Sequence, residues 1–198
     1  MKLILASSSP RRHELLLRLN RPFDIIPPDV DESLVPIDGS PEEYCQTLAV
    51  LKADCVSLNY PQTLVIAADT IVVVDGQILG KPVDKAQAIQ MLETLSGKTH
   101  KVLTGVNFQW QEKGITHTFS ELTSVTFREL DLTDINYYID TCPPYDKAGS
   151  YGIQDWSAVF VENINGCYDN VVGFPLSQFY LELKKCGINL LDTISEPL

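Results

Sequence analysis

Apolar positions along the chain follow two patterns, short runs rich in β-branched residues and longer stretches with helical spacing. The short runs predict strands, which we place at residues 2–6, 23–26, 64–74, 102–111, 115–127, 158–162 and 168–172. Stretches in which apolar residues recur three and four positions apart predict helices, which we place at residues 10–19, 41–58, 85–96, 133–140 and 175–186. Strands and helices therefore alternate, as they do in an α/β fold.

Turn and cap signals support this division of the chain. Residues that favour helix starts precede three of the predicted helices: Ser9 with Pro10, the capping box Ser40-Pro41-Glu42-Glu43, and Asp84. Asp75-Gly76 is a hairpin signal, and Glu112-Lys113-Gly114 lies at the centre of a predicted long antiparallel hairpin. Because such a hairpin does not fit a purely parallel sheet, we expect a mixed twisted sheet with flanking helices.

Composition places the chain among ordinary globular proteins. It has 198 residues, of which 44% are hydrophobic and 21% are charged. No internal repeat, low-complexity tract or linker divides the sequence, so we expect one domain that spans residues 1–198.

The charge balance is strongly acidic, with 15 basic and 26 acidic residues and a formal net charge of −11. Nucleic-acid polymers and anionic membranes bind proteins largely through phosphate neutralisation, so we expect neither as a partner. A small anionic ligand is still possible, but it would need a local basic cluster held against the overall negative field.

The sequence predicts a cytoplasmic protein. No apolar run approaches the ~20 residues of a transmembrane helix, and the apolar stretch at residues 1–6 is too short for a signal peptide. The five cysteines are widely spaced without a CxxC pair, which favours free thiols in a reducing compartment. Only three histidines are present and none is spaced with a cysteine as a ligand pair, so we expect no zinc site.

The segment from Ser7 to Arg12 is a candidate anion site. It joins the end of a predicted strand to a helix N-terminus, where unpaired N–H groups and the helix dipole favour a negative charge. Arg11 and Arg12 lie unfavourably in the first helical turn unless an anion binds between them, and guanidinium groups match phosphate oxygens in pairs. The alternative is a serine-capped helix whose arginines are exposed to solvent.

Asp69 is the candidate for acid–base chemistry. It interrupts an otherwise apolar strand, where a carboxylate is costly to desolvate and is usually paired, bound to a metal or catalytic. A structural ion pair with a buried lysine or arginine is the alternative. Lys81, in the turn Leu79–Pro82, is a weaker candidate because turn lysines are usually solvated.

Three further features could belong to the same site. The loop of residues 146–154 contains two glycines that allow close approach of a ligand, and its Gln154 carries both a donor and an acceptor that could read a base edge. Asp29, Asp31 and Glu32 could hold a hard cation or form a solvated loop. Lys52 could reach from its helix toward the site or into water.

No single cluster identifies the function, but together the clusters fit one kind of chemistry. Basic groups would bind phosphates, carboxylates would bind Mg²⁺ or Mn²⁺, and one carboxylate would activate water. The sequence has no GxSxG elbow, no GxxxxGK[ST] loop and no GxGxxG fingerprint, which argues against serine-hydrolase, P-loop and Rossmann functions.

Six segments in order resemble the Maf family. They run from residue 3 to about residue 180 and read LASSSPRRHELL, AADTIV, LGKP, MLETLSGKTHKVLTGV, DKAGSYGIQ and INGCYDNVVGFPL. The resemblance implies a fold like that of the inosine triphosphate pyrophosphatases, with two lobes around a cleft. It also implies hydrolysis of a nucleoside triphosphate to the monophosphate and pyrophosphate, with a divalent metal ion, Mg²⁺ or Mn²⁺, and a possible homodimer.

The resemblance also assigns expected roles by position. Asp69 matches the general base, and Glu32 matches an acidic position associated, together with Asp69, with the metal. The residues that match phosphate-binding positions of the family are Ser7, Arg11, Arg12, Lys52 and Lys81. Positions that separate branches of the family fall on Arg12, Thr70 and Gln154.

The branch that this pattern resembles acts on dTTP and UTP, whereas the branch that acts on 7-methyl-GTP differs at the same positions. The dTTP and UTP branch usually continues YGIQG, but here Asp155-Trp156 follow Gln154. A non-catalytic nucleotide-binding regulator of cell division is the alternative function, because the family name is linked to septum formation.

Overall fold

The structure is a computed structural model that describes residues 1–37 and 39–191 of the chain. Asp38 and residues 192–198, which the predicted single domain includes, lie outside the described residues. The strands are β1 (Leu3–Leu5), β2 (Asp24–Ile25), β3 (Leu64–Val74), β4 (Gln77–Leu79), β5 (Thr99–Trp110), β6 (Ile115–Phe127) and β7 (Val161–Asn165). The α-helices are α1 (Pro10–Leu17), α2 (Pro41–Ser57), α3 (Lys85–Leu95), α4 (Leu132–Thr141), α5 (Tyr168–Val172) and α6 (Leu176–Lys185).

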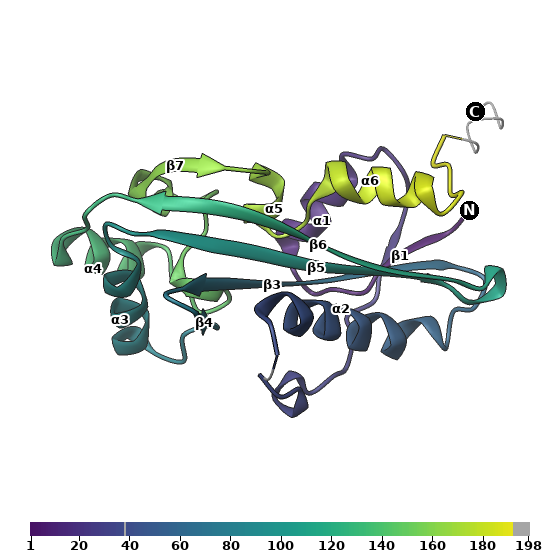
Figure 1. Cartoon of the computed structure of the whole chain (residues 1–198), viewed down its shortest axis with the longest axis horizontal. Coiled ribbons are helices and arrows are strands. Elements are labelled where there is room, and N and C mark those ends of the chain that lie inside the picture. The colour runs from purple at the N-terminus through teal and green to yellow at the C-terminus, as the bar shows by residue number, and fades with distance from the viewer. Residues whose placement is uncertain (38, 192–198) are drawn as a thin grey trace.

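The strands form one seven-stranded sheet in the order β2-β1-β3-β5-β6-β7, with β4 paired to β3. β1 runs parallel to both β2 and β3, whereas β3, β5, β6 and β7 pair antiparallel. The mixed sheet predicted from the long hairpin is therefore confirmed. β3, β5 and β6 are long and extend through most of the length of the molecule (Figure 1).

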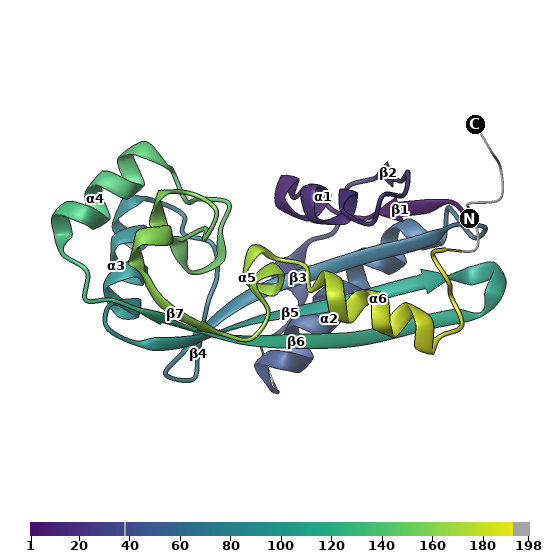
Figure 2. The same ribbon diagram turned by 90° about the horizontal axis from the view of Figure 1, so that it is seen from above.

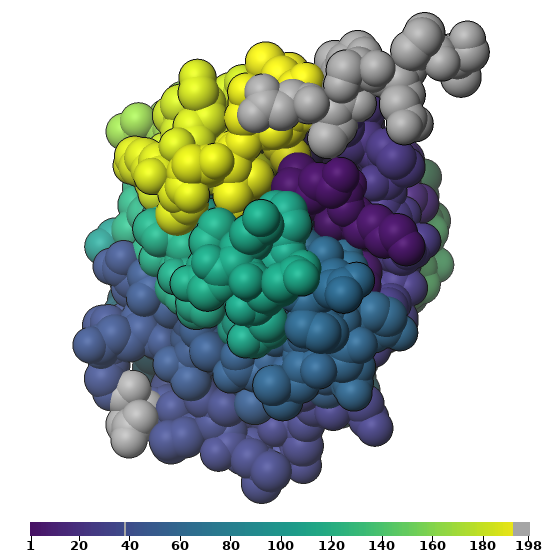
Figure 3. Space-filling view, turned by 90° about the vertical axis from the view of Figure 1, so that its right-hand side faces the viewer, coloured from purple at the N-terminus to yellow at the C-terminus, as the bar shows by residue number. Residues whose placement is uncertain are grey.

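Helices cover both faces of this sheet. α2 lies on one face, whereas α1, α5 and α6 lie on the other, and α3 and α4 lie together near the end of the sheet farthest from the N-terminus (Figures 1 and 2). Figure 3 shows the molecule from the end that carries the N-terminus. The tip of the β5–β6 hairpin, in teal, lies there between α6 in yellow and α2 in blue. No helix of the described ranges is both long and apolar enough to cross a membrane.

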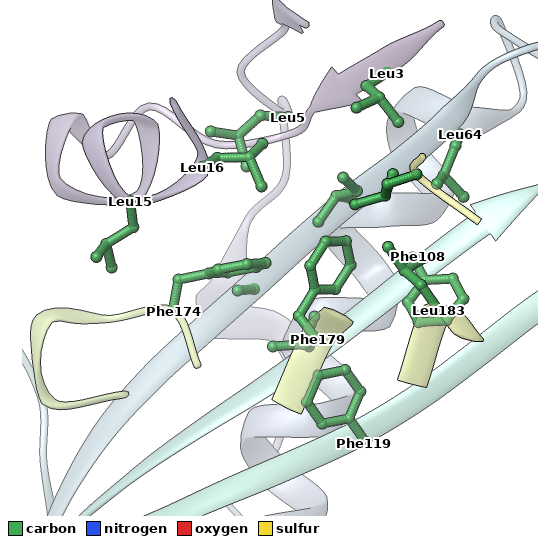
Figure 4. Close-up of a cluster of buried hydrophobic side chains, with 14 of the residues drawn as sticks. Leu3, Leu5, Leu15, Leu16, Leu64, Phe108, Phe119, Phe174, Phe179 and Leu183 are labelled. Atoms are coloured by element: carbon green, nitrogen blue, oxygen red, sulfur yellow. The ribbon is translucent and has the colours of Figure 1, made fainter. Parts of the chain in front are cut away.

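Two large hydrophobic clusters give the sheet a core at each end. The first packs α1 and α6 against β1, β3 and β5, and includes Leu15, Phe108, Phe174 and Phe179, which converge between the helices and the sheet (Figure 4). The second packs α3 and α4 against the opposite ends of β3, β5 and β6, with Tyr138 among its fully buried residues. The protein therefore has two lobes, one around each cluster, which share one continuous sheet.

One predicted strand near the C-terminus is wrong, and a second one begins later than predicted. Residues 168–172 form helix α5, because Asn170 turns its amide inward to donate to Val102 O and Thr123 Oγ1, and Gly173 at φ +127° ends the turn. Residues 156–160 form a 3-10 helix and the strand begins only at Val161. The carboxylate of Asp155 caps this helix through the backbone N–H of Ser157, 3.1 Å away.

The cysteine prediction is confirmed in part, because all five thiols are free. They are distributed over both lobes, and Cys45 is fully buried in α2. Desolvation by burial raises the pKa of the Cys45 thiol to about 12, so this thiol is protonated and unreactive at neutral pH.

A glycine allows α2 to lie very close to the sheet. Gly105 on β5 is the register partner of Asp69 on β3. A Cβ atom at position 105 would lie 2.5 Å from the carbonyl carbon and oxygen of Cys45 in α2. Since Lys52 follows Cys45 by about two helical turns, this close packing sets the height of Lys52 above the sheet.

Replacement of Gly105 by alanine should therefore destabilise the protein. The added methyl group meets helix backbone, which cannot rotate away, and overpacking of this kind costs about 1–3 kcal/mol. Urea unfolding followed by circular dichroism measures the loss. Gly80→Ala is the matched control, because a Cβ there meets no atom within 4 Å. Equal stability of the two variants would contradict the close packing.

Candidate functional site

One cavity of about 260 Å³ brings together segments that are far apart in the sequence. Its lining includes residues from the start of α1, from α2 and β3, and from the loop of residues 146–154. Nine of the site residues predicted from the sequence line it: Ser7, Arg11, Arg12, Glu32, Lys52, Asp69, Thr70, Lys81 and Gln154. Asp29 and Asp31 do not line it, and Asp31 instead caps the short 3-10 helix Glu32–Leu34.

The start of α1 has the geometry of an anion-binding loop. Ser9 caps the helix by accepting a hydrogen bond from the backbone N–H of Arg12 at 3.4 Å, and Pro10 occupies the first turn. The buried Ser7 hydroxyl accepts from the backbone N–H of Ser9 at 3.2 Å. These bonds fix the loop before the helix, so the N-terminal end of the helix dipole is directed at the cavity.

Arg12 is held in place by neutral acceptors of the protein. Its Nε donates to the carbonyl oxygen of Gly173 at 2.9 Å, Nη2 donates to Thr70 Oγ1 at 2.9 Å, and Nη1 donates to Ser7 Oγ at 3.4 Å. Thr70 Oγ1 also lies 3.0 Å from the hydroxyl of the buried Thr104. A guanidinium carries five N–H donors, so two remain for a ligand once these three bonds are made.

The electrostatic environment of Arg12 suits an anion. Desolvation by burial lowers the pKa of Arg12, and the negative charge of Asp69 opposes this shift. The ordinary pKa of a guanidinium lies so far above neutrality that the side chain stays charged. A half-buried cation of this kind gains from any negative ligand that enters the cavity.

Lys52 bridges two carboxylates of the site. Its Nζ lies 2.5 Å from Asp69 Oδ1 and 2.9 Å from Glu32 Oε1. The side chains of Lys52 and Asp69 are 8% and 11% exposed, whereas that of Glu32 is 42% exposed. Asp69 thus forms the ion pair with a buried lysine that the sequence allowed. It also lines the cavity, as a residue with a role in acid–base chemistry must.

Glu32 is negatively charged at neutral pH. Partial burial opposes its ionisation, but the ion pair with Lys52 and the charges of Lys81 and Arg12 outweigh this effect and lower the pKa of Glu32. Its carboxylate and that of Asp69 both lie within bonding distance of one ammonium group, so they face a common space.

The donor set of this pair fits a hard divalent cation. Mg²⁺ is commonly bound by one or two carboxylates while phosphate oxygens and waters complete the shell, and Mn²⁺ prefers the same ligands. Within residues 1–37 and 39–191 no three His, Cys, Asp or Glu side chains are grouped to hold a metal ion by themselves. Glu32 and Asp69 therefore fit a metal whose coordination a phosphate ligand completes.

Comparison with known proteins assigns the chain to a family. The profile of the Maf-like protein family matches residues 2–186. The chain belongs to the Maf family. A relative from Carboxydothermus hydrogenoformans, named dTTP/UTP pyrophosphatase, is 46% identical over 94% of this chain and 100% of its own. A relative from Bacillus cytotoxicus with the same name is 49% identical over 93% of this chain and 95% of its own.

A solved structure shares the fold of this Maf protein at low sequence identity. The HAM1 protein from Coxiella burnetii aligns with 93% of this chain and 99% of its own, with a TM-score of 0.51 and 15% identity. The expected α/β fold with a mixed sheet and flanking helices is thereby confirmed.

Hydrogen bonds to neighbouring segments hold the Maf loop of residues 146–154 in place. Gly149, at φ +68°, donates its N–H to the carbonyl oxygen of Gly80 at 3.0 Å, next to Lys81. The Tyr151 hydroxyl lies 2.8 Å from Nε2 of the buried His100. Gln154 is exposed at the end of this loop and lines the cavity.

The residues after Gln154, where the chain departs from the pattern of the dTTP and UTP branch, lie outside the lining of the cavity. Asp155 caps the following 3-10 helix, and the ring of Trp156 packs against Tyr137 and Phe160 at centroid distances of 5.0 and 5.4 Å. Neither Asp155 nor Trp156 lines the cavity. The departure therefore leaves the lining itself unchanged, but it places the Asp155 carboxylate 3.7 Å from Nζ of Lys147, which lines the cavity.

Two residues of the site received no role from the sequence. Asp146 and Lys147 both line the cavity, and Asp146 forms an ion pair with Arg11 at 2.7 Å. Their position beside the glycine loop was the only signal available. With them, the lining has five cationic side chains (Arg11, Arg12, Lys52, Lys81 and Lys147) against three carboxylates (Glu32, Asp69 and Asp146). The cavity is therefore locally positive in a chain of net charge −11.

Removal of the ammonium of Lys52 should destabilise the fold. Lys52→Met leaves the Asp69 carboxylate buried without its partner, and we expect a loss of about 2–4 kcal/mol, less than for a fully buried pair because Glu32 is half-exposed. Chemical denaturation measures the loss, and adding Asp69→Asn should recover much of it.

Lys85→Met is the control for the comparison of Lys52→Met with the Lys52→Met/Asp69→Asn double variant. Lys85 pairs with Asp140 at 2.5 Å, but both side chains are exposed, so the loss should stay below about 1 kcal/mol. No recovery in the Lys52→Met/Asp69→Asn double variant would show that the two charges are not coupled.

Proposed function

We propose that this Maf protein is a nucleoside triphosphate pyrophosphatase that hydrolyses dTTP and UTP to the monophosphate and pyrophosphate. The observation that carries the proposal is the almost fully buried Asp69 carboxylate in a cavity whose lining is otherwise rich in cations. Relatives at 46% and 49% identity over nearly the whole chain are named dTTP/UTP pyrophosphatase, which supports the same activity here.

The cations of the cavity would bind the triphosphate. Arg12 offers two unused N–H donors from a fixed position, and Arg11 lies beside it in the first turn of α1. Lys52 and Lys81 approach from α2 and from the turn after β4. Guanidinium groups bind phosphate oxygens in pairs, so the arginines would orient the phosphates while the lysines neutralise charge.

Asp69 is the proposed general base. Lys52 bonds Asp69 Oδ1, and among the described residues no donor reaches Oδ2, which can therefore accept a proton from water. The water oxygen would form a bond to the α-phosphorus as its proton passes to Oδ2, and the bond from the α-phosphorus to the bridging oxygen would break to release pyrophosphate. General-base assistance typically contributes ~10²–10⁴ in rate, and positioning and charge neutralisation supply the rest.

Glu32 and Asp69 would hold a divalent cation, Mg²⁺ or Mn²⁺, together with the phosphates. Such an ion, when bound, withdraws charge from the phosphate oxygens and favours deprotonation of a bound water. The ionised Glu32 carboxylate neutralises part of the cation charge, and Lys52 keeps both carboxylates directed at the same space.

Gln154 is the proposed reader of the base. Its side-chain amide has both a donor and an acceptor, which match the O4 and N3–H edge that thymine and uracil share. Cytosine presents the reverse arrangement, so an amide held in the orientation that pairs with thymine or uracil would be left with unsatisfied groups. The exposed position of Gln154 at the end of the loop leaves this edge open to a ligand in the cavity.

Substitution of the proposed base should abolish most turnover. Asp69→Asn keeps the size of the side chain but removes its charge and basicity, so we expect kcat to fall at least ~10²-fold. Pyrophosphate release from dTTP with Mg²⁺ or Mn²⁺ measures kcat, and circular dichroism verifies the fold. Asp140→Asn, which removes an exposed carboxylate, should keep normal activity. Near-normal release by Asp69→Asn would remove Asp69 from this role, and nucleotide binding without any release by the wild type would favour the binding-only regulator.

Base preference should depend on the side chain at position 154. We expect wild-type kcat/KM for dTTP and UTP to exceed the values for CTP and 7-methyl-GTP. Gln154→Ala should lower the ratio of kcat/KM for UTP to kcat/KM for CTP by roughly fivefold to tenfold, which corresponds to the loss of one hydrogen bond. Gln90→Ala, on the exposed side of α3, should leave the ratio unchanged. A wild-type preference for CTP or the methylated purine would contradict the assignment.

A further inference from the structure

Asp146 binds two of the cations that line the cavity. Its Oδ2 lies 2.7 Å from Arg11 Nη1 and its Oδ1 lies 2.9 Å from Lys147 Nζ. The carbonyl oxygen of Asp146 accepts a second bond from Arg11 Nη2 at 3.3 Å. Arg11 and Asp146 are 135 positions apart, so this contact joins helix α1 to the loop of the other lobe.

Arg11 and Arg12 are restrained in different ways. Arg12 donates to a carbonyl oxygen and two hydroxyl groups, which are neutral and belong to the fixed framework of the site. The hydrogen bonds of the Arg11 side chain, within the part of the chain that the structure describes, all go to Asp146. Arg11 is therefore tied to an exchangeable negative charge, whereas Arg12 is already directed at the cavity.

Carboxylate oxygens and phosphate oxygens both accept charge-assisted hydrogen bonds from a guanidinium, so they can replace each other as its partners. We propose that Asp146 is a positioning residue that occupies Arg11 and Lys147 in the free protein and is displaced from them by the polyphosphate of the substrate, an inference that rests on the proposed function. Asp146 thus competes with every polyphosphate that enters the cavity, pyrophosphate product included.

Asp146 is ionised throughout the neutral pH range, as a competitor must be. Partial burial opposes ionisation, but hydrogen bonds from Lys147 and Arg11 outweigh it and lower the pKa of Asp146 to about 2. The side chain is nevertheless 55% exposed, so solvent screens the ion pair and a ligand can reach it. Exchange of one anion for another should therefore be inexpensive.

The competition would weaken ligand binding and aid product release. Removal of the Asp146 charge leaves Arg11 without the carboxylate it pairs with, and leaves Lys147 with only the more distant carboxylate of Asp155, 3.7 Å away, so ligand binding should become tighter. For a partly exposed ion pair the expected gain in affinity is roughly threefold to tenfold. A residue with a merely structural role would give weaker binding or no change when it is replaced.

The test is direct calorimetric titration of tripolyphosphate and pyrophosphate, each with and without Mg²⁺, into the full-length wild type and two variants. Asp146→Asn keeps the size of the side chain and removes its charge. Asp140→Asn is the matched control, because it also removes one carboxylate and one ion pair, that with Lys85 at 2.5 Å, away from the cavity. Both variants change the net charge equally, so long-range effects cancel in the comparison.

We expect Asp146→Asn to bind both probes threefold to tenfold more tightly than the wild type, and Asp140→Asn to match the wild type. Unchanged or weaker binding by Asp146→Asn, with normal binding by the wild type, would overturn the role of Asp146 alone. Failure of the wild type and both variants to bind either probe would overturn the proposed phosphate site, and the role of Asp146 with it.

Discussion

The ion pair between Lys52 and Asp69 is the constraint on which the rest of the site depends. A carboxylate within the central strand of a sheet is costly unless a cation reaches it. Here the cation comes from α2, which lies near enough only because Gly105 leaves room for its backbone. The same ammonium reaches Glu32 and so gathers two acidic side chains in one place.

The division of the sheet between two lobes explains where a ligand can bind. Each lobe has its own hydrophobic cluster, and the cavity takes lining residues from both. The first lobe supplies the helix start with Ser7, Arg11 and Arg12, and the second supplies the loop that ends at Gln154. A nucleotide matches this arrangement, because its phosphates lie at one end and its base at the other. The overall acidic charge restricts anion binding to the place where cations are concentrated.

Sequence patterns predicted most of the fold because local physics determines it, and together with the family resemblance they identified residues that the structure brings to one cavity. Asp69 stood out as a charge in an apolar strand, and Ser9 with Pro10 identified the helix that presents the arginines. Residues 168–172 were assigned wrongly because a segment of five residues is too short for its pattern of apolar and polar positions to distinguish a strand from a turn of helix. The role proposed for Asp146 could not be predicted either, since its contact with Arg11 exists only once the two lobes have folded together.

The position at which water attacks tests the proposed chemistry most directly. The protein would hydrolyse dTTP in water labelled with heavy oxygen, under single-turnover conditions with Mg²⁺ or Mn²⁺, and mass spectrometry would locate the label in the products. Attack at the α-phosphorus predicts labelled dTMP and unlabelled pyrophosphate. Label in pyrophosphate or inorganic phosphate, or no hydrolysis of dTTP at all, would contradict a cavity that directs water at the α-phosphorus.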